Sequence, residues 1–449
     1  MTVPQVVDEA APAARRREQR GWYWYDWADS AFQTTVLTVF LGPYLTSVAT
    51  TAAGGEGGFV SFLGLDLRPK AYFTALVTIS VLLQIVIMPV VGALADHTGR
   101  KKQILAFLAY LGAAATLGFY FVSGGGYALG GALFLLANVV YGSARVVYDS
   151  FLPQISGVEE RDAISSRGWG FGYLGGGLLL AVNLVLYLSG AVETGLAVRV
   201  SLASAGMWWA AFTVIPMLRL RNRPVATHDA TAGRAVTGSF RQLGRTIADL
   251  RGYPRTLLFL AAYLIYNDGV QTVIGFSATY ADQELGLGKT TQISSILMVQ
   301  FVAFGGALAL GRLAMVIGMK RTVLASLVVW TAVVAVAYFL QEGAAVQFYA
   351  IAFLIAIVLG GTQALSRALY SLVIPPGREA EYFSLYQISD KGSAFLGSLT
   401  LTLALQITDS YRSAIVSLIV FFVVGFVLLM TVNLPRAVRE AGNEVPQHI

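Results

Sequence analysis

Long apolar segments recur along the whole chain, separated by short polar stretches. Each is long enough to cross the hydrocarbon core of a bilayer, which takes about 20 residues in a helix. Because no water is present there, the backbone of such a segment satisfies its own hydrogen bonds by forming a helix. The pattern predicts an all-α integral membrane protein with twelve spans, at residues 24–49, 71–95, 103–123, 127–151, 168–190, 198–218, 255–281, 291–317, 322–341, 345–374, 383–407 and 411–433.

The polar stretches divide this pattern into parts. We expect a cytoplasmic tail, a six-helix half, a cytoplasmic linker, a second six-helix half and a cytoplasmic tail, at 1–21, 22–218, 219–254, 255–433 and 434–449. Apolar residues late in the linker recur at helical spacing, which suits either a helix lying on the inner membrane surface or a plain basic linker. These residues are Phe240, Leu243, Ile247 and Leu250.

Composition agrees with a membrane protein. Hydrophobic residues make up 56% of the chain and charged residues only 12%, against roughly 25% charged residues in a soluble protein. Most of the 31 Lys and Arg lie in segments that an even number of spans puts on the same side as the termini. The positive-inside rule therefore predicts that both termini lie in the cytoplasm, and we expect the protein in the plasma membrane. Topology explains the net charge of +6, and no nucleic-acid partner is expected.

The sequence gives little support for a disulfide, a metal site, a nucleotide site or a catalytic domain. The chain has no cysteine and three histidines, so we expect no disulfide, no metal site and no cofactor. GLGKTT at 286–291 has Gln283 where a phosphate loop needs its first glycine. The loops are too short to hold a catalytic domain, so we expect a monomeric protein in the bilayer that is not an enzyme.

The second half of the chain repeats the first. GALADHTGRKK at 92–102 matches GRLAMVIGMKR at 311–321, and RVVYDSFLP at 145–153 matches RALYSLVIP at 367–375. DSAFQT at 29–34 more weakly matches NDGVQT at 267–272. Two parallel six-helix repeats around one central cavity are the architecture of the major facilitator superfamily, which is the fold that we predict.

GALADHTGRKK also resembles the signature loop of that superfamily. Gly92 suits a close helix approach, Gly99 suits a tight turn, and Arg100 and Lys101 suit the cytoplasmic face. The resemblance implies that Asp96 latches the two halves by lying near the N-terminus of a helix from the other half. The alternative is a simple charged turn. Our predicted gating residues are Asp96, Arg100, Lys101 and Asp149.

Polar residues inside the predicted spans form four pairs with i,i+4 spacing, so each pair shares one helix face. The pairs are Asp29 with Gln33, Arg145 with Asp149, Asn267 with Gln271, and Gln363 with Arg367. The superfamily resemblance implies that the first, fourth, seventh and tenth helices line the cavity, where these pairs would converge. We expect Asp26 nearer the membrane interface, beside Trp and Tyr residues.

These side chains suggest a site for a small zwitterion. Arg145 or Arg367 would bind a carboxylate, and Asp29 or Asp268, the deepest carboxylate, would bind an amine or load a proton. Alternatively, Arg145 and Asp149 neutralise each other as a structural or gating pair. GWGFGYLGG at 168–176 is similar to the glycine motif of proton antiporters, but Tyr173 replaces its proline. Close helix packing is the favoured interpretation.

Three segments are similar to the vacuolar amino-acid effluxer family, the autophagy-related branch of the superfamily. They are YDWADSAF at 25–32, YNDGVQT at 266–272 and GGTQALSRALYSLVIPPGREAEYFSLYQISDK at 360–391. The family usually has Asn at the position of Asp29. The resemblance implies a secondary active or facilitative transporter of a small solute, an amino acid in efflux, by alternating access. Alternatives are a non-transporting membrane sensor or scaffold, and a proton-coupled drug antiporter, which Tyr173 disfavours.

Overall fold

A computed structural model describes residues 12–223, 250–392 and 395–448 of the chain. The predicted linker helix around Phe240 to Ile247 lies outside the described residues. Of the predicted cytoplasmic tail, residues 12–21 form the first turns of a helix that continues into the first span. Hydropathy misses these turns because they extend beyond the apolar segment.

The N-terminal half contains helices α1–α8 and a short β-hairpin. Its elements are α1 (Pro12–Ala31), η1 (Phe32–Phe40), α2 (Leu41–Ala52), β1 (Val60–Phe62), β2 (Leu65–Leu67), α3 (Pro69–Thr98), α4 (Lys101–Gly118), η2 (Phe119–Phe121), α5 (Tyr127–Asp149), α6 (Leu152–Ile155), α7 (Arg161–Ser189) and α8 (Thr194–Arg219). Strands β1 and β2 pair antiparallel.

The C-terminal half follows the undescribed part of the linker. Its elements are η3 (Leu250–Gly252), α10 (Pro254–Gln283), α11 (Lys289–Ile317), α12 (Met319–Ala337), α13 (Ala345–Leu372), α14 (Glu379–Gly392), α15 (Phe395–Thr408), α16 (Tyr411–Ser417), α17 (Ile419–Thr431) and α18 (Leu434–Glu440). Among the described residues, 11 helical segments are long and apolar enough to cross a membrane. The remaining predicted span, 383–407, corresponds to α14 and α15, which flank residues 393–394.

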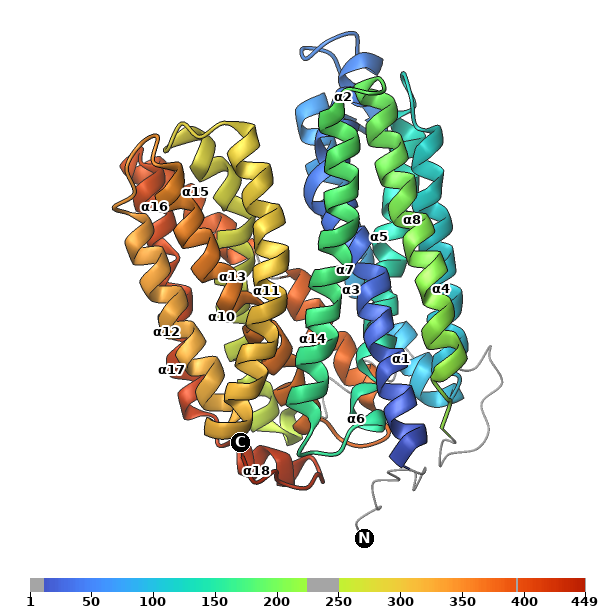
Figure 1. The fold of residues 1–449 in the computed structure, drawn as a ribbon, viewed down its shortest axis with the longest axis vertical. Helices are drawn as coiled ribbons and strands as arrows, with labels where there is room; N and C mark the ends of the chain where they lie inside the picture. The colour runs from blue at the N-terminus through green and yellow to red at the C-terminus, as the bar shows by residue number, and fades with distance from the viewer. Residues whose placement is uncertain (1–11, 224–249, 393–394, 449) are drawn as a thin grey trace.

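The two halves stand side by side, with α14 reaching toward the N-terminal half (Figure 1). Each half has a hydrophobic core of its own, one around Trp22, Tyr148 and Trp209 and the other around Tyr263, Trp330 and Tyr370. We call the end of the molecule where α1 begins and α18 lies the α18 end (Figure 1). The opposite end, which carries the loop with β1 and β2, is called the hairpin end.

Two glycines of the superfamily-like loop have the roles that the sequence predicts. Gly99 ends α3 in the left-handed region, with φ of 63°. A Cβ on Gly92 would lie 2.5 Å from the carbonyl oxygen of Ala380 in the other half. The prediction of a tight turn and a close approach is therefore confirmed at these positions.

The glycines of α7 allow close packing on two sides. A Cβ on Gly172 would lie 2.6 Å from Ser30 Oγ, and one on Gly175 would lie 2.8 Å from the carbonyl oxygen of Trp27. On another face of α7, a Cβ on Gly177 would lie 2.9 Å from the Gln300 Cβ of α11. Small residues thus bring α7 against both α1 and the C-terminal half, as expected for membrane helices.

The first span departs from α-helical geometry in its middle. Phe32–Phe40 is a π-helical stretch, and the Thr38 hydroxyl donates to the Gln33 carbonyl oxygen at 2.9 Å. The stretch is rich in β-branched residues, including Thr34, Thr35 and Val36, which have low α-helix propensity. Such π-helical turns are frequent at functional sites.

Candidate functional site

A cavity of about 640 Å³ lies between the two halves, within the size range of small-molecule sites, roughly 300–1,000 Å³. Its wall comes from α1, η1, α3, α5 and α7 of the N-terminal half and from α10, α11, α12, α13, α14 and α16 of the C-terminal half. Phe73, Tyr280 and Phe348 line the cavity, and each lies in the part of its helix that is close to the hairpin end. The cavity therefore extends from the middle of the molecule toward the hairpin end.

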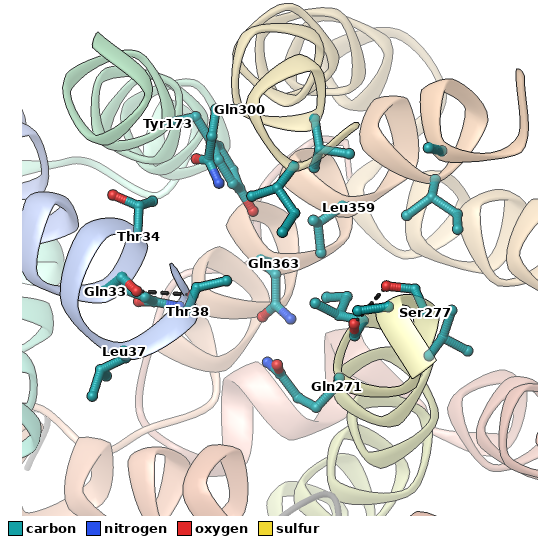
Figure 2. A pocket seen from close by; sticks show the side chains of 18 of the residues that line it. Gln33, Thr34, Leu37, Thr38, Tyr173, Gln271, Ser277, Gln300, Leu359 and Gln363 are labelled. Carbon is teal, nitrogen blue, oxygen red and sulfur yellow. Dashed lines mark hydrogen bonds between the residues drawn. The ribbon is translucent and has the colours of Figure 1, made fainter. Parts of the chain in front are cut away.

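Amide side chains form much of the polar wall. Gln33, Gln271 and Gln363, all predicted from the sequence, line the cavity. Figure 2 shows the side chains of Gln271 and Gln363 directed toward each other, with Gln33 on the opposite side. The π-helical stretch places Thr34 and Thr38 on the same wall as Gln33.

Part of the wall is apolar and belongs mostly to the C-terminal half. It includes Ile274 of α10, Val334 of α12, and Ile351 and Leu359 of α13. A solute with one polar and one apolar end would find a matching surface for each within the same cavity.

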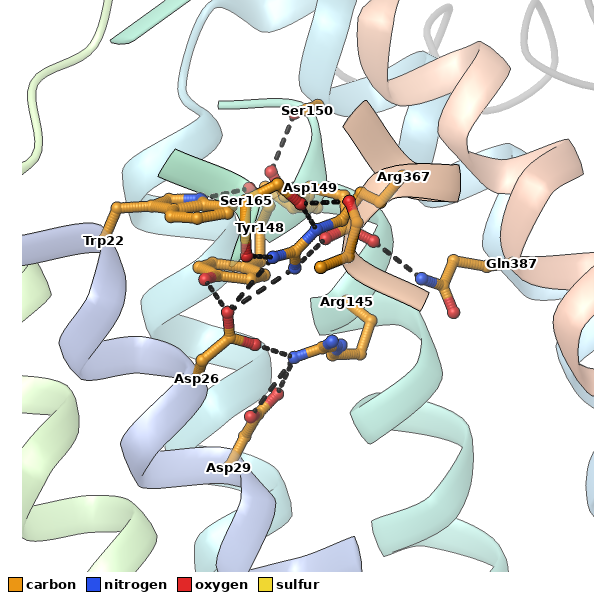
Figure 3. Close-up of polar contacts among 12 residues, drawn as sticks. Trp22, Asp26, Asp29, Arg145, Tyr148, Asp149, Ser150, Ser165, Arg367 and Gln387 are labelled. Carbon is orange, nitrogen blue, oxygen red and sulfur yellow. Dashed lines mark hydrogen bonds and ion pairs between the residues drawn. The ribbon is translucent and has the colours of Figure 1, made fainter. Parts of the chain in front are cut away.

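An ionic network of five residues (Figure 3) forms the floor of the cavity through Arg145, Asp149 and Arg367, which line it. Arg145 Nη1 lies 2.6 Å from Asp26 Oδ1 and 3.1 Å from Asp29 Oδ2. Arg367 of the other half lies 3.1 Å from Asp149 Oδ1 and 3.4 Å from Asp26 Oδ2. Asp26 thus bridges the two arginines, and the network joins the halves.

Neutral side chains complete this network. The Tyr148 hydroxyl donates to Asp26 at 2.5 Å, and Gln387 Nε2 donates to Asp149 at 2.7 Å. Arg367 Nε donates to Ser165 Oγ at 2.9 Å. All five charged residues are buried, with exposures of 0–6%. Three carboxylates face two guanidinium groups, so the network carries a formal charge of −1.

Asp26 lies well inside α1, which begins at Pro12, and its position nearer the membrane interface stays a prediction. One expectation about these residues is wrong. Arg145 and Asp149 do not neutralise each other, because Arg145 pairs with α1 and Asp149 pairs with Arg367. Sharing a helix face does not decide which partner on another helix is closer.

Three predicted residues lie behind the wall. Asp29 is fully buried against Arg145. Asn267 accepts a hydrogen bond from Gln363 Nε2 at 2.8 Å. Asp268 Oδ1 accepts from the backbone N–H of Gly397 at 3.0 Å, which directs this carboxylate toward α15. The described lining of the cavity does not include these residues.

A second ionic group closes the α18 end. Asp96 Oδ2 accepts from the backbone N–H of Glu381, in the first turn of α14, at 2.9 Å. Lys101 Nζ lies 2.8 Å from Asp96 Oδ1 and 2.9 Å from Glu379 Oε2. The Arg100 side chain is exposed. The carboxylate thus lies where the superfamily resemblance implies, and the gating role of all four residues stays a prediction.

The electrostatics of Glu379 favour its ionised form. Burial alone raises the pKa of the Glu379 carboxyl, but the Lys101 ammonium and the backbone N–H of Gly377 outweigh this effect. The pKa therefore lies below the ordinary value for glutamate, and Glu379 is charged at neutral pH.

Hydrogen bonds to the backbone also join the two halves. Arg161 Nη1 donates to the Ser371 carbonyl oxygen at 2.8 Å, and Ser165 Oγ donates to the Ala364 carbonyl oxygen at 2.7 Å.

Sequence reasoning missed several residues of the wall. Trp169, Gln300, Gln387, Asp390 and Lys391 all line the cavity. Two signals could have identified Asp390 and Lys391: charges inside a predicted span are costly and usually functional, and both residues end the family-like segment 360–391. In the internal repeat, Lys391 is equivalent to Trp169.

Comparison with known proteins gives consistent findings. A family model described as "Vacuole effluxer Atg22 like" matches residues 14–442. YxiO of Bacillus subtilis (strain 168), described as an uncharacterized MFS-type transporter, is 29% identical over 438 residues, covering 96% of this chain and 98% of that protein. Autophagy-related protein 22-1 of Penicillium rubens is 25% identical over 558 residues, covering 98% and 93%.

Solved structures are similar in fold. The fucose:proton symporter FucP of E. coli superposes with a TM-score of 0.67 at 13% identity, covering 93% of this chain and 98% of that chain. A bacterial homologue of the iron transporter ferroportin, in an outward-facing state, gives a TM-score of 0.64 at 14% identity, with coverages of 93% and 98%. The prediction of an all-α major facilitator fold is therefore confirmed.

Proposed function

The chain belongs to the vacuole effluxer Atg22-like family of MFS-type transporters, and we propose that it carries a small zwitterionic solute, an amino acid, by alternating access. The observation that carries the proposal is the cavity between the halves, which reaches the hairpin end while ionic contacts join the halves at the α18 end. Such contacts are non-covalent and can break and re-form during a transport cycle. The protein acts as a carrier with no chemical step.

We place the protein in the plasma membrane, with its α18 end on the cytoplasmic side. The positive-inside bias of the loops supports this orientation, as does the predicted position of both termini on that side. In this orientation the structure is an outward-facing state, with the latch of Asp96, Lys101 and Glu379 on the cytoplasmic side. Efflux would then require this latch to open.

We also propose that a proton couples to transport at the ionic network. The network has one carboxylate more than it has guanidinium groups, and burying an uncompensated charge is costly. One proton neutralises the excess. Asp29 is the proposed carrier because, among the described residues, it pairs with Arg145, whereas Asp26 bridges both arginines and Asp149 pairs with Arg367 and also accepts from Gln387.

The test is uptake of labelled amino acids into proteoliposomes that are preloaded with the same unlabelled solutes, with and without an imposed pH gradient. Wild-type protein should show saturable exchange of some amino acids and faster or greater accumulation under one sign of the gradient. Asp29→Asn should keep exchange but lose the response to the gradient, because the amide mimics the protonated acid.

Two results would count against the proposal in different ways. If folded wild-type protein exchanges no amino acid in the panel, the amino-acid assignment fails. If Asp29→Asn responds to the gradient as wild type does, the proton site lies elsewhere while transport stands. Lys70→Gln is the control, because Lys70 pairs with Glu56 on the exposed surface.

A further inference from the structure

One ion pair of the cavity wall differs from those of the floor. Asp390 and Lys391 are consecutive on α14, line the cavity, and hold Oδ2 and Nζ 3.2 Å apart. We propose that this pair is the docking point for the charged head of the solute: Lys391 binds its carboxylate and Asp390 binds its ammonium. The inference rests on the proposed function, and it transfers the binding role from Arg145, Arg367, Asp29 and Asp268 to α14.

Exposure separates the two groups of charges. The side chains of Lys391 and Asp390 are 24% and 16% exposed. The side chain of Arg145 is 8% exposed and that of Arg367 is 1% exposed. A partly solvated ion pair contributes little stability and is easily exchanged, whereas removing a partner from a buried pair is strongly unfavourable. A solute therefore exchanges ion-pair partners far more easily at α14 than at the floor.

Neighbouring side chains hold Asp390 in place. Its Oδ1 accepts hydrogen bonds from the Tyr263 hydroxyl at 3.2 Å and from Asn267 Nδ2 at 3.1 Å. Gln363 in turn donates to Asn267 Oδ1 at 2.8 Å. These contacts engage Oδ1 and fix the orientation of the carboxylate, whose Oδ2 pairs with Lys391; an incoming ammonium group would take the place of Lys391 there. Preorganisation of this kind lowers the entropic cost of binding.

Lys391 also connects the pair to the N-terminal half. Its Nζ lies 5.6 Å from the centre of the Tyr141 ring on α5, and the Tyr141 hydroxyl donates to Gln33 Oε1 at 2.6 Å. A carboxylate bound to Lys391 would compete with this cation–π contact between the halves. Occupation of the docking point would thereby alter a contact that must change when the halves move.

The experiment compares three competitors that share one side chain: an amino acid, the amine that lacks its carboxylate, and the acid that lacks its amino group. Each is tested for inhibition of labelled amino-acid exchange in proteoliposomes with wild type, Lys391→Gln, Asp390→Asn and the surface control Lys70→Gln. Wild type should prefer the amino acid to each analogue by about tenfold or more, because hydrogen bonds to charged groups are the stronger ones.

The expected pattern is crossed, which means that each variant loses one of the two preferences and keeps the other. Lys391→Gln should lose the preference over the amine and keep the preference over the deaminated acid, and Asp390→Asn should do the reverse. Lys391→Arg should retain both preferences, which shows that charge rather than fold is responsible. If both single variants keep both preferences while exchange continues, the docking point is wrong and the proposed function is intact.

A binding readout separates failure of docking from failure of transport. The same three compounds are added to purified protein, and the midpoint of thermal unfolding is measured. If wild type does not exchange but its unfolding midpoint shows the crossed pattern, transport fails and the docking point stands. If the amino acids raise the midpoint equally in wild type and in both variants, or raise it in none, the docking point is overturned.

Discussion

Arginine, rather than lysine, suits the two cationic positions of the floor. Arg367 contacts Asp26, Asp149 and Ser165 at the same time, which needs several donors in a fixed plane. Its guanidinium carbon also lies 4.6 Å from the centre of the Trp22 ring, a distance at which cation–π attraction contributes. A lysine ammonium, being a single point of charge, could not reproduce this set of contacts.

We expect Arg367→Gln to destabilise the protein strongly. The substitution leaves Asp149 and Asp26 buried with one cation between the three carboxylates, and breaking a buried pair costs about 3–5 kcal/mol. The measurement is the midpoint of thermal unfolding in detergent. Lys70→Gln breaks an exposed pair and should cost about 0–1 kcal/mol. Equal effects of the two substitutions would contradict a structural role for the network.

At the scale of elements, the start of α14 is one of the places where the halves are held together. The N-terminus of a helix carries unsatisfied N–H groups and a partial positive charge, and Asp96 of α3 accepts from one of these groups. Gly92 permits the approach because any side chain there would collide with the backbone of Ala380. The latch therefore depends on the relative position of two helices from different halves.

Asp96→Ala should shift the protein away from the outward-facing state. The substitution removes the charged cap of α14 and one partner of Lys101, worth about 1.5–3 kcal/mol for hydrogen bonds to a charged group. Because the chain has no cysteine, Thr38→Cys on the exposed cavity wall provides a single reactive thiol. Its labelling by a membrane-impermeant maleimide should slow in the Asp96→Ala background.

His97→Gln serves as the matched control for this measurement. His97 is next to Asp96 on α3 but is exposed, so its replacement should leave the labelling rate unchanged. If Asp96→Ala and His97→Gln changed the labelling rate equally, the Asp96 carboxylate would not be the group that holds the latch.

At the scale of the whole molecule, the internal repeat explains where the charges meet. Arg145 and Arg367 hold equivalent positions in α5 and α13, and both end on the floor of one cavity between the halves. Two carboxylate side chains of the first half are not repeated in the second half. Asp29 has Asn267 as its counterpart, and Asp96 has Met315. The N-terminal half thus supplies the three carboxylates of the floor and the Asp96 carboxylate of the latch, while the Glu379 carboxylate of the latch belongs to the C-terminal half.

The orientation predicts which ends of the molecule are accessible from outside intact cells. Lys70→Cys at the hairpin end should react with a membrane-impermeant maleimide, since its side chain is 70% exposed. Arg321→Cys, exposed near the start of α12, should react only after the membrane is permeabilised. The reverse pattern would invert the orientation, and the present conformation would then be inward-facing.

The linear pattern of the chain was sufficient for several features. Apolar runs located the spans to within a few residues, except where polar turns extend α1 and α7 beyond the apolar runs. The roles of Gly92 and Gly99 could be predicted from the sequence because, at each position, the backbone needs a residue without a side chain. The internal repeat and the family-like segments identified the fold, and the i,i+4 pairs of Gln33, Gln271 and Gln363 pointed to side chains that line the cavity.

Which charges meet was decided only by the tertiary structure. Asp26 and Arg367 are 341 residues apart in the chain, and depth along a helix does not reveal the direction in which a side chain points. Asp268 is deep but directed toward α15, while Asp390 and Lys391 face the cavity. The sequence by itself determined how many helices cross the membrane and which of their residues are charged. Their pairing depends on the rotation and contact of helices remote in sequence, since short-range Coulomb and hydrogen-bond energies act across space rather than along the chain.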